Sequence, residues 1–128
     1  MKALVADRSA TTRRVVIRAL RVVGIQDVLE FADIPAAMAA LQGDPDFVIV
    51  EWSTAGDAAL DLVSDLRSRE SGAHSKVIVM TERAGRPDLE RALAFGIQGY
   101  VLKPFDTQLL IEQLAAAMQP GEDNAEAA

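Results

Sequence analysis

An uninterrupted apolar run in the middle of the chain, residues 47–50, constrains the fold more than any other stretch. It consists of phenylalanine, valine and isoleucine, and such a run predicts a strand that is buried on both faces. The run ends at the carboxylate of Glu51, and the small and polar residues 53–56 beyond it favour a loop. Because open α/β sheets place functional residues at the carboxyl ends of their strands, Glu51 is the first candidate site residue.

Further apolar runs alternate along the chain with segments of helical periodicity. Strands are expected at residues 3–6, 28–31, 47–50, 76–80 and 100–102, and helices at residues 12–23, 34–42, 58–69, 88–95 and 107–118. This alternation, with short connections, predicts parallel strands joined by right-handed crossovers, with helices on both faces of the sheet. The sequence therefore predicts a doubly wound α/β fold of five strands and five helices.

Short polar residues stand where the expected helices begin, and their side chains can accept hydrogen bonds from the free backbone N–H groups there. The expected N-caps are Ser9, Asp33, Asp57 and either Asp106 or Thr107. The side chains expected on the solvent side of the first helix are those of Arg13, Arg14, Arg18 and Arg21. The inner face of the last helix is expected to consist of Leu109, Leu110, Ile111 and Leu114.

The composition restricts both the domain organisation and the chemistry. A length of 128 residues predicts one domain at residues 1–119, followed by an acidic, disordered tail at residues 120–128. The chain has no cysteine and a single histidine, His74, which is expected to be exposed, so disulfides and multi-histidine metal sites are excluded. A net charge of −6 argues against a nucleic-acid partner, and no apolar run approaches the roughly 20 residues of a membrane span. We expect a cytoplasmic protein.

Several polar residues follow the ends of the expected strands. They are Asp7, Glu51, Thr81 and Lys103. In a sheet of parallel strands joined by helical crossovers, all the carboxyl ends point to the same edge. The periodicity and the connection lengths therefore predict that these side chains gather at one rim.

This pattern resembles the receiver domains of bacterial two-component response regulators, and their single-domain chemotaxis members (CheY-like) in particular. The resemblance covers residues 2–118 and rests on the strand that ends at Asp7, the strand that ends at Glu51, Thr81 and the pair Lys103–Pro104. It implies a flavodoxin-like fold of five β–α units with strand order 2-1-3-4-5. It also implies a cis peptide bond between Lys103 and Pro104.

The resemblance assigns roles to these positions. In the family, an aspartate at the position of Glu51 takes a phosphoryl group from a histidine kinase. Mg²⁺ is held in the family by that aspartate, by an acid pair after the first strand and by a backbone carbonyl. The residues at the positions of Thr81 and Lys103 bind phosphoryl oxygens, and the aromatic at the position of Tyr100 swings inward on activation.

Two departures from the family pattern alter this expectation: Glu51 replaces the phosphoacceptor aspartate, and Arg8 replaces the second member of the acid pair. Glutamate moves the carboxylate outward by roughly 1.5 Å, and displacements near 1 Å can cost about 100-fold in rate. We therefore expect a degenerate pocket of Asp7, Arg8, Glu51, Thr81 and Lys103, with no enzymatic activity and no cofactor. Arg8 is expected to fill the metal position and to pair with Asp7 or Glu51, which would be the ligands if Mg²⁺ did bind.

The chain is accordingly interpreted as a protein–protein interaction module, a monomer or weak dimer, whose partner is a histidine kinase or a downstream effector. By the resemblance, its docking face is formed by the fourth helix, the last strand and the fifth helix. The switch and docking candidates are Thr81, Arg91, Phe95, Tyr100, Phe105 and Gln108, of which Phe95 and Phe105 are equally candidates for the core.

Two other functions remain open from the sequence. One is a receiver that is still phosphorylated in the presence of Mg²⁺ despite Glu51. The other is a flavin or nucleotide binder on the same fold, with a phosphate at the helix start near residues 9–12, although Asp7 would repel that phosphate. The sequence does not distinguish an active-like from an inactive-like conformation of the receiver.

Overall fold

The computed structural model describes residues 1–41, 45–52, 58–69, 74–82, 90, 93, 94 and 96–118. The described strands are β1 (Lys2–Ala6), β2 (Asp27–Phe31), β3 (Phe47–Trp52), β4 (Lys76–Thr81) and β5 (Gly99–Leu102). The helices are α1 (Ala10–Val22), α2 (Ile34–Ala39), α3 (Ala58–Ser68) and α5 (Thr107–Ala117). All the expected strands are confirmed. Most of the helix expected at residues 88–95, and the tail expected at 120–128, lie outside the described residues.

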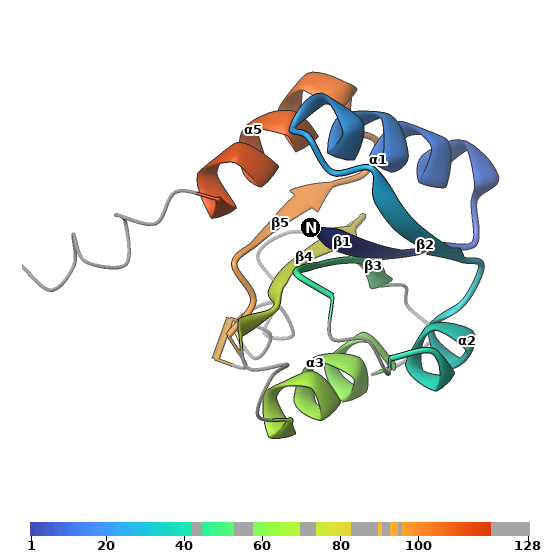
Figure 1. Cartoon of the computed structure of the whole chain (residues 1–128), viewed down its shortest axis with the longest axis vertical. Coiled ribbons are helices and arrows are strands. Elements are labelled where there is room, and N and C mark those ends of the chain that lie inside the picture. Colours follow the sequence, from blue (N-terminus) through green and yellow to red (C-terminus); the bar gives the residue numbers. More distant parts are fainter. Residues whose placement is uncertain are drawn as a thin grey trace, which may run out of the picture.

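The strands form one sheet in the order β2-β1-β3-β4-β5, and every neighbouring pair is parallel. Glu51 lies opposite Met80, and Trp52 lies opposite Thr81. The doubly wound topology and the strand order expected from the sequence are therefore confirmed (Figure 1). The central position of β3, between β1 and β4, explains why its apolar run is continuous: both of its faces and both of its edges are covered.

Two hydrophobic layers lie on opposite faces of the sheet. Figure 1 shows α1 and α5 on one side and α2 and α3 on the other. Along β1, Ala3 and Val5 belong to the core cluster that includes α1 and α5, whereas Leu4 and Ala6 belong to the cluster that includes α2 and α3. This alternation is the two-residue period of a strand, and it divides each central strand between both layers.

The helix caps follow the sequence closely. Ser9, Asp33 and Asp106 each accept a hydrogen bond from the backbone N–H three residues later. Asp106, and not Thr107, therefore caps α5. Gly24 has a φ of 95°, a left-handed conformation that glycine adopts without strain, directly after α1. The Asp57 cap lies outside the described residues.

Three local expectations can be compared with the structure. α2 ends at Ala39, with Ala40 as its C-cap, earlier than the expected residue 42. Leu109 is 39% exposed, so its expected place on the inner face of α5 is wrong, whereas Leu110 and Leu114 are fully buried. The helix turns about 100° per residue, which leaves Leu109 at the margin of the buried stripe. The cis bond between Lys103 and Pro104 is confirmed.

No helix in the described ranges is long and apolar enough to cross a lipid bilayer. His74 is exposed, as expected.

Replacing Leu114 with alanine is expected to lower the free energy of unfolding by about 2–5 kcal/mol, because truncation removes buried contacts and leaves a cavity. Leu109→Ala, at the exposed margin of the same helix, is the matched control and is expected to cost about 1 kcal/mol. Urea unfolding followed by circular dichroism measures both values. Equal losses for the two variants would contradict the burial pattern of α5.

Candidate functional site

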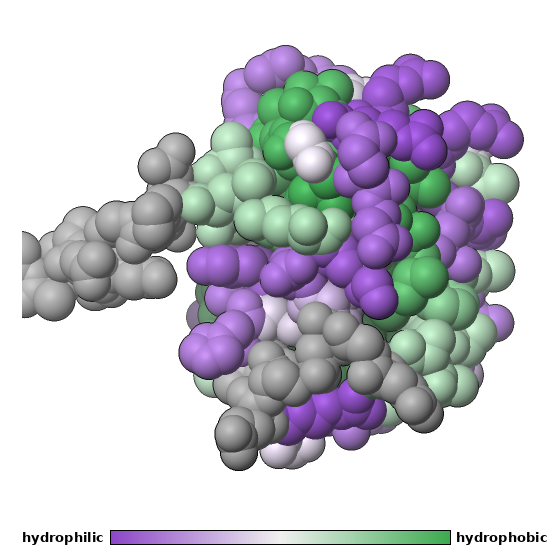
Figure 2. Space-filling view, viewed as in Figure 1, coloured by the Kyte–Doolittle hydropathy of each residue, from purple (hydrophilic) through white to green (hydrophobic). Residues whose placement is uncertain are grey.

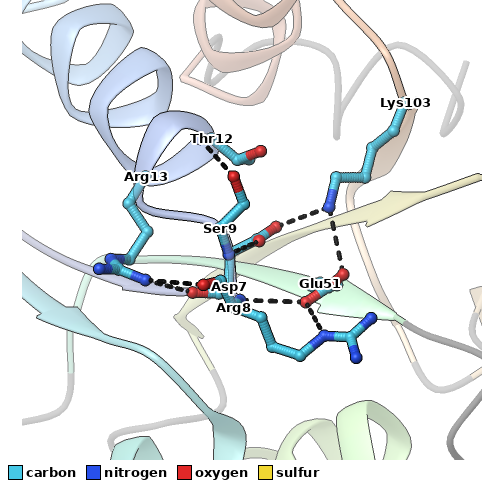
Figure 3. A network of polar contacts seen from close by, with 7 residues as sticks. All are labelled: Asp7, Arg8, Ser9, Thr12, Arg13, Glu51 and Lys103. Carbon is cyan, nitrogen blue, oxygen red and sulfur yellow. Dashed lines mark hydrogen bonds and ion pairs between the residues drawn. The ribbon is translucent and has the colours of Figure 1, made fainter.

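The site lies at the carboxyl edge of the sheet, where three strands deliver charged side chains to one point (Figure 3). Asp7 directly follows β1, Glu51 is the fifth residue of β3, and Lys103 directly follows β5. The Lys103 backbone N–H donates to the carbonyl of Thr81 at 2.7 Å. This hydrogen bond joins the backbone just after β5 to the last residue of β4. The parallel topology thus brings together residues that are far apart in the sequence, as their positions at the strand ends predict.

The Lys103 ammonium bridges the two carboxylates. Its Nζ lies 2.9 Å from Oδ2 of Asp7 and 3.2 Å from Oε2 of Glu51. The side chain of Asp7 is 0% exposed. The remaining oxygens accept backbone hydrogen bonds, Asp7 Oδ1 from Ser9 at 2.8 Å and Glu51 Oε1 from Arg8 at 3.2 Å. Each carboxylate oxygen of this pair therefore has a partner within the chain.

Arg8 contributes to the site from its solvent-exposed rim. Its Nε lies 3.6 Å from Oε1 of Glu51, so the expected pairing with Glu51 is present. However, its side chain is 74% exposed, and the ammonium of Lys103 already lies between the carboxylates. The pairing of Arg8 with Glu51 is therefore confirmed, but it is made from the exposed rim, and the cation between the two carboxylates is Lys103.

The ionisation of the bridge follows from competing effects. Burial alone would raise the pKa of Glu51, but the hydrogen bond from the Arg8 N–H and the nearby Lys103 outweigh it, so this pKa lies below its ordinary value of 4.5. Burial alone would lower the pKa of Lys103, but Asp7 and then Glu51 outweigh it, so this pKa lies above 10.5. Both groups are therefore charged at neutral pH.

Arg13 supports the site from α1, a role that was missed in the sequence. It was expected on the solvent side, yet its side chain is only 17% exposed and its Nε lies 2.6 Å from Oε2 of Glu30. One guanidinium nitrogen also donates to the carbonyls of Asp7 at 2.7 Å and Arg8 at 3.4 Å. Arg13 therefore holds the turn that presents Asp7. The available signal was its spacing, because it lies three and seven residues before the buried Val16 and Leu20.

The remaining candidates are distributed over the strands and helices around this bridge. Thr81 is buried at the end of β4, next to the site in the sheet. Tyr100 is half-buried against the core layer of α2 and α3, whereas Phe105 packs against the layer of α1 and α5. Gln108 is exposed on α5. Arg91 and Phe95 lie outside the described residues.

A shallow groove of about 440 Å³ runs between β5 and α5. Its lining consists of Leu93, Gln98, Gly99, Tyr100, Val101, Leu102, Leu109 and Gln113. Three of these, Leu93, Leu102 and Leu109, are among the exposed large hydrophobic residues. The groove thus coincides with the β5 and α5 part of the docking face expected from the resemblance.

The donor set of the site does not fit Mg²⁺. This ion prefers oxygen ligands in octahedral geometry. Among the described residues, no group of three or more histidine, cysteine, aspartate or glutamate side chains could hold a metal ion. The two carboxylates present, Asp7 and Glu51, already use their oxygens for Lys103 and for backbone N–H groups.

Comparisons with known proteins agree with this architecture. The family model described as response regulator receiver domain matches residues 3–115. The chain is 36% identical over 115 residues to chemotaxis protein CheY-3 of Vibrio cholerae, covering 89% of this chain and 88% of that protein. It is 34% identical to chemotaxis protein CheY of Pseudomonas aeruginosa, covering 89% and 93% respectively. The solved structure of Vibrio cholerae CheY4 matches with a TM-score of 0.80 at 23% identity, covering 91% of this chain and 98% of that one, which supports the fold.

Removing the bridging ammonium is expected to destabilise the protein markedly. Lys103→Met leaves the buried Asp7 carboxylate without its counter-charge and should lower the free energy of unfolding by about 2–4 kcal/mol. Arg8→Gln removes the exposed cation of the same site and is expected to cost less than about 1 kcal/mol. Urea unfolding near neutral pH measures both, and a larger loss for Arg8→Gln would mean that Arg8 is the dominant cation.

The pH dependence of stability reports on Glu51. Because its pKa is lowered from 4.5 in the folded state, the charged form stabilises the fold above that pH, and this contribution is lost as the pH falls through the folded-state pKa. The difference in free energy of unfolding between the unaltered protein and Glu51→Gln is therefore expected to be constant near neutral pH and to shrink in acid. Urea unfolding at a series of pH values measures it. A difference that widens in acid would contradict the ion pair.

Proposed function

The chain belongs to the response regulator receiver family, and we propose that it is an atypical receiver, which acts through protein–protein contacts and is not phosphorylated at position 51. As a CheY-like receiver domain, it is a module of two-component signalling.

The observation that carries the proposal is the bridge of Lys103 between Asp7 and Glu51. The two carboxylates are balanced by two cations, Lys103 and Arg8, so the formal charge of the site is zero without any metal ion. Mg²⁺ would have to displace the ammonium from a buried aspartate. Such a displacement would leave a desolvated cation without its partners, which is costly.

The geometry of Glu51 supports the same conclusion. Phosphoryl transfer depends mainly on placing the attacking oxygen in line with the leaving group, and on cations that neutralise the developing charge. Here one oxygen of Glu51 is held by Lys103 and the other by the Arg8 backbone. The carboxylate is thus fixed as a structural acceptor of hydrogen bonds, and attack would require it to leave these partners.

The proposed partner is another signalling protein, either a histidine kinase or a downstream effector. The groove between β5 and α5 supports this proposal, because the exposed Leu102 and Leu109 line it together with the half-buried Tyr100. Exposed apolar residues around an aromatic side chain are typical of protein interfaces. In this proposal the chain binds no nucleic acid or membrane, and it forms a monomer or a weak dimer.

The competing function is a receiver that is still phosphorylated. Two features favour it: Thr81 remains at the end of β4, and Lys103 remains at the carboxyl edge. In this alternative Lys103 would release Asp7 and Glu51 when Mg²⁺ binds. The two functions therefore differ in one measurable property, the affinity of the pocket for Mg²⁺.

Titration with Mg²⁺ followed by Trp52 fluorescence tests the proposal, because Trp52 is half-buried and adjoins Glu51. We expect no saturable change in fluorescence, and no added phosphoryl group in the intact mass after incubation with acetyl phosphate. Saturable quenching together with one added phosphoryl group would establish the competing function.

The control is Arg8→Asp/Glu51→Asp, which restores the acidic residues that the family pattern has at these positions. This variant is expected to gain a saturable Mg²⁺ response, because three carboxylates then face one lysine and provide the oxygen ligands that Mg²⁺ requires. Glu51→Asp alone separates the effect of side-chain length from that of Arg8. If the double variant also fails to bind Mg²⁺, the substituted residues are not the cause of the lost chemistry.

A further inference from the structure

The outer face of α1 carries an unusual charge distribution for an acidic protein. The chain has 19 acidic and 13 basic residues, yet α1 contains four arginines and no acidic residue. Figure 2 shows strongly hydrophilic side chains over the part of the surface that α1 forms. We propose that this face is a docking surface for an acidic segment of a partner protein.

Three of the arginines form a row. Arg14, Arg18 and Arg21 are all exposed, and their spacing of four and three residues places them on one side of the helix. Seven residues at about 1.5 Å each give a row roughly 10 Å long. A guanidinium can bind a carboxylate through two parallel hydrogen bonds, so the row suits several carboxylates on one short segment.

The row has no evident structural task. Within the described part of the chain, Arg14, Arg18 and Arg21 form no side-chain ion pair or hydrogen bond. The neighbouring Arg13 is the internal contrast, because its guanidinium binds Glu30 and two backbone carbonyls. Arg21 alone lies in the last turn of α1, where a positive charge interacts favourably with the helix dipole and stabilises the helix. That effect does not account for Arg14 and Arg18.

The charge distribution favours a protein segment over other anions. A nucleic acid extends well beyond a 10 Å row and would meet the remainder of a chain whose net charge is −6. A membrane-bound helix needs several large apolar residues beside its cations, and within α1 only Val22, at 63% exposure, is an exposed large hydrophobic residue. A short acidic segment matches the row and leaves Val22 available for one apolar contact.

The test uses the full chain and a fluorescein-labelled peptide of alternating glutamate and alanine, with binding followed by fluorescence anisotropy at low salt. Arg14→Gln/Arg18→Gln/Arg21→Gln is expected to weaken binding by about tenfold or more, since each exposed ion pair contributes little but three act together. Amide chemical shifts in a titration of the unaltered protein are expected to change along α1. Charge reversal of the row to glutamate is expected to transfer binding to a lysine–alanine peptide.

The control neutralises two lysines elsewhere and is compared with the two-residue variant Arg14→Gln/Arg18→Gln of the row, so that the change in net charge is the same. Lys2→Gln/Lys76→Gln neutralises the first residues of β1 and β4, and it is expected to change the affinity by no more than about twofold. Equal weakening by this control would show a non-specific charge effect and overturn the proposal.

Other occupants of the face would give different results. Tighter binding of a single-stranded oligonucleotide or of phosphatidylserine vesicles than of the acidic peptide would overturn the proposal in favour of those anions. Neutralising Glu122, Asp123 and Glu126 in the full chain is expected to leave the affinity for the peptide unchanged. A large gain in affinity would show that the chain's own acidic residues compete for the row, and it would likewise overturn the proposal.

Discussion

The burial of the Asp7 carboxylate is the constraint on which the arrangement of the site depends. A charge removed from water needs a partner, and the Lys103 ammonium supplies it at 2.9 Å. Because Lys103 follows β5 and Asp7 follows β1, this contact spans the sheet across β3 and β4. Glu51 on β3 joins the same ammonium from the central strand. The ion pairs thus connect the ends of separate strands at the edge where receivers carry out their chemistry.

The longer acid at position 51 is accommodated at this edge without a change in the fold. Glutamate extends to Lys103 and to the Arg8 N–H, and both contacts favour its charged form. The carboxylate oxygens of the site are thereby all engaged within the chain, which is the basis for proposing a receiver that works without Mg²⁺. Arg8 adds the second cation from the rim, where water screens it and its contribution to stability is small.

Helix α1 serves two purposes with the same residue type. Arg13 turns inward and holds the backbone carbonyls of the turn after β1, with Glu30 fixing the guanidinium. The row of Arg14, Arg18 and Arg21 turns outward, and the described residues give it no partner. One helix therefore stabilises the pocket on one side and presents a basic face on the other. Only the direction of each side chain separates these roles.

The sequence by itself determined the strands, their parallel direction and the edge at which Asp7, Glu51 and Lys103 meet, because buried apolar runs and strand-end residues are local patterns with a fixed meaning in an α/β sheet. The order of the strands was implied by the resemblance to receiver domains. The sequence did not determine how the two cations share the carboxylates: Lys103 bridges Asp7 and Glu51, whereas Arg8 pairs with Glu51 from the exposed rim. Nor did it show that Arg13 turns inward or that Leu109 lies at the exposed margin of α5. Tertiary structure decided these points, since each depends on how far a side chain reaches toward partners that are distant in the sequence.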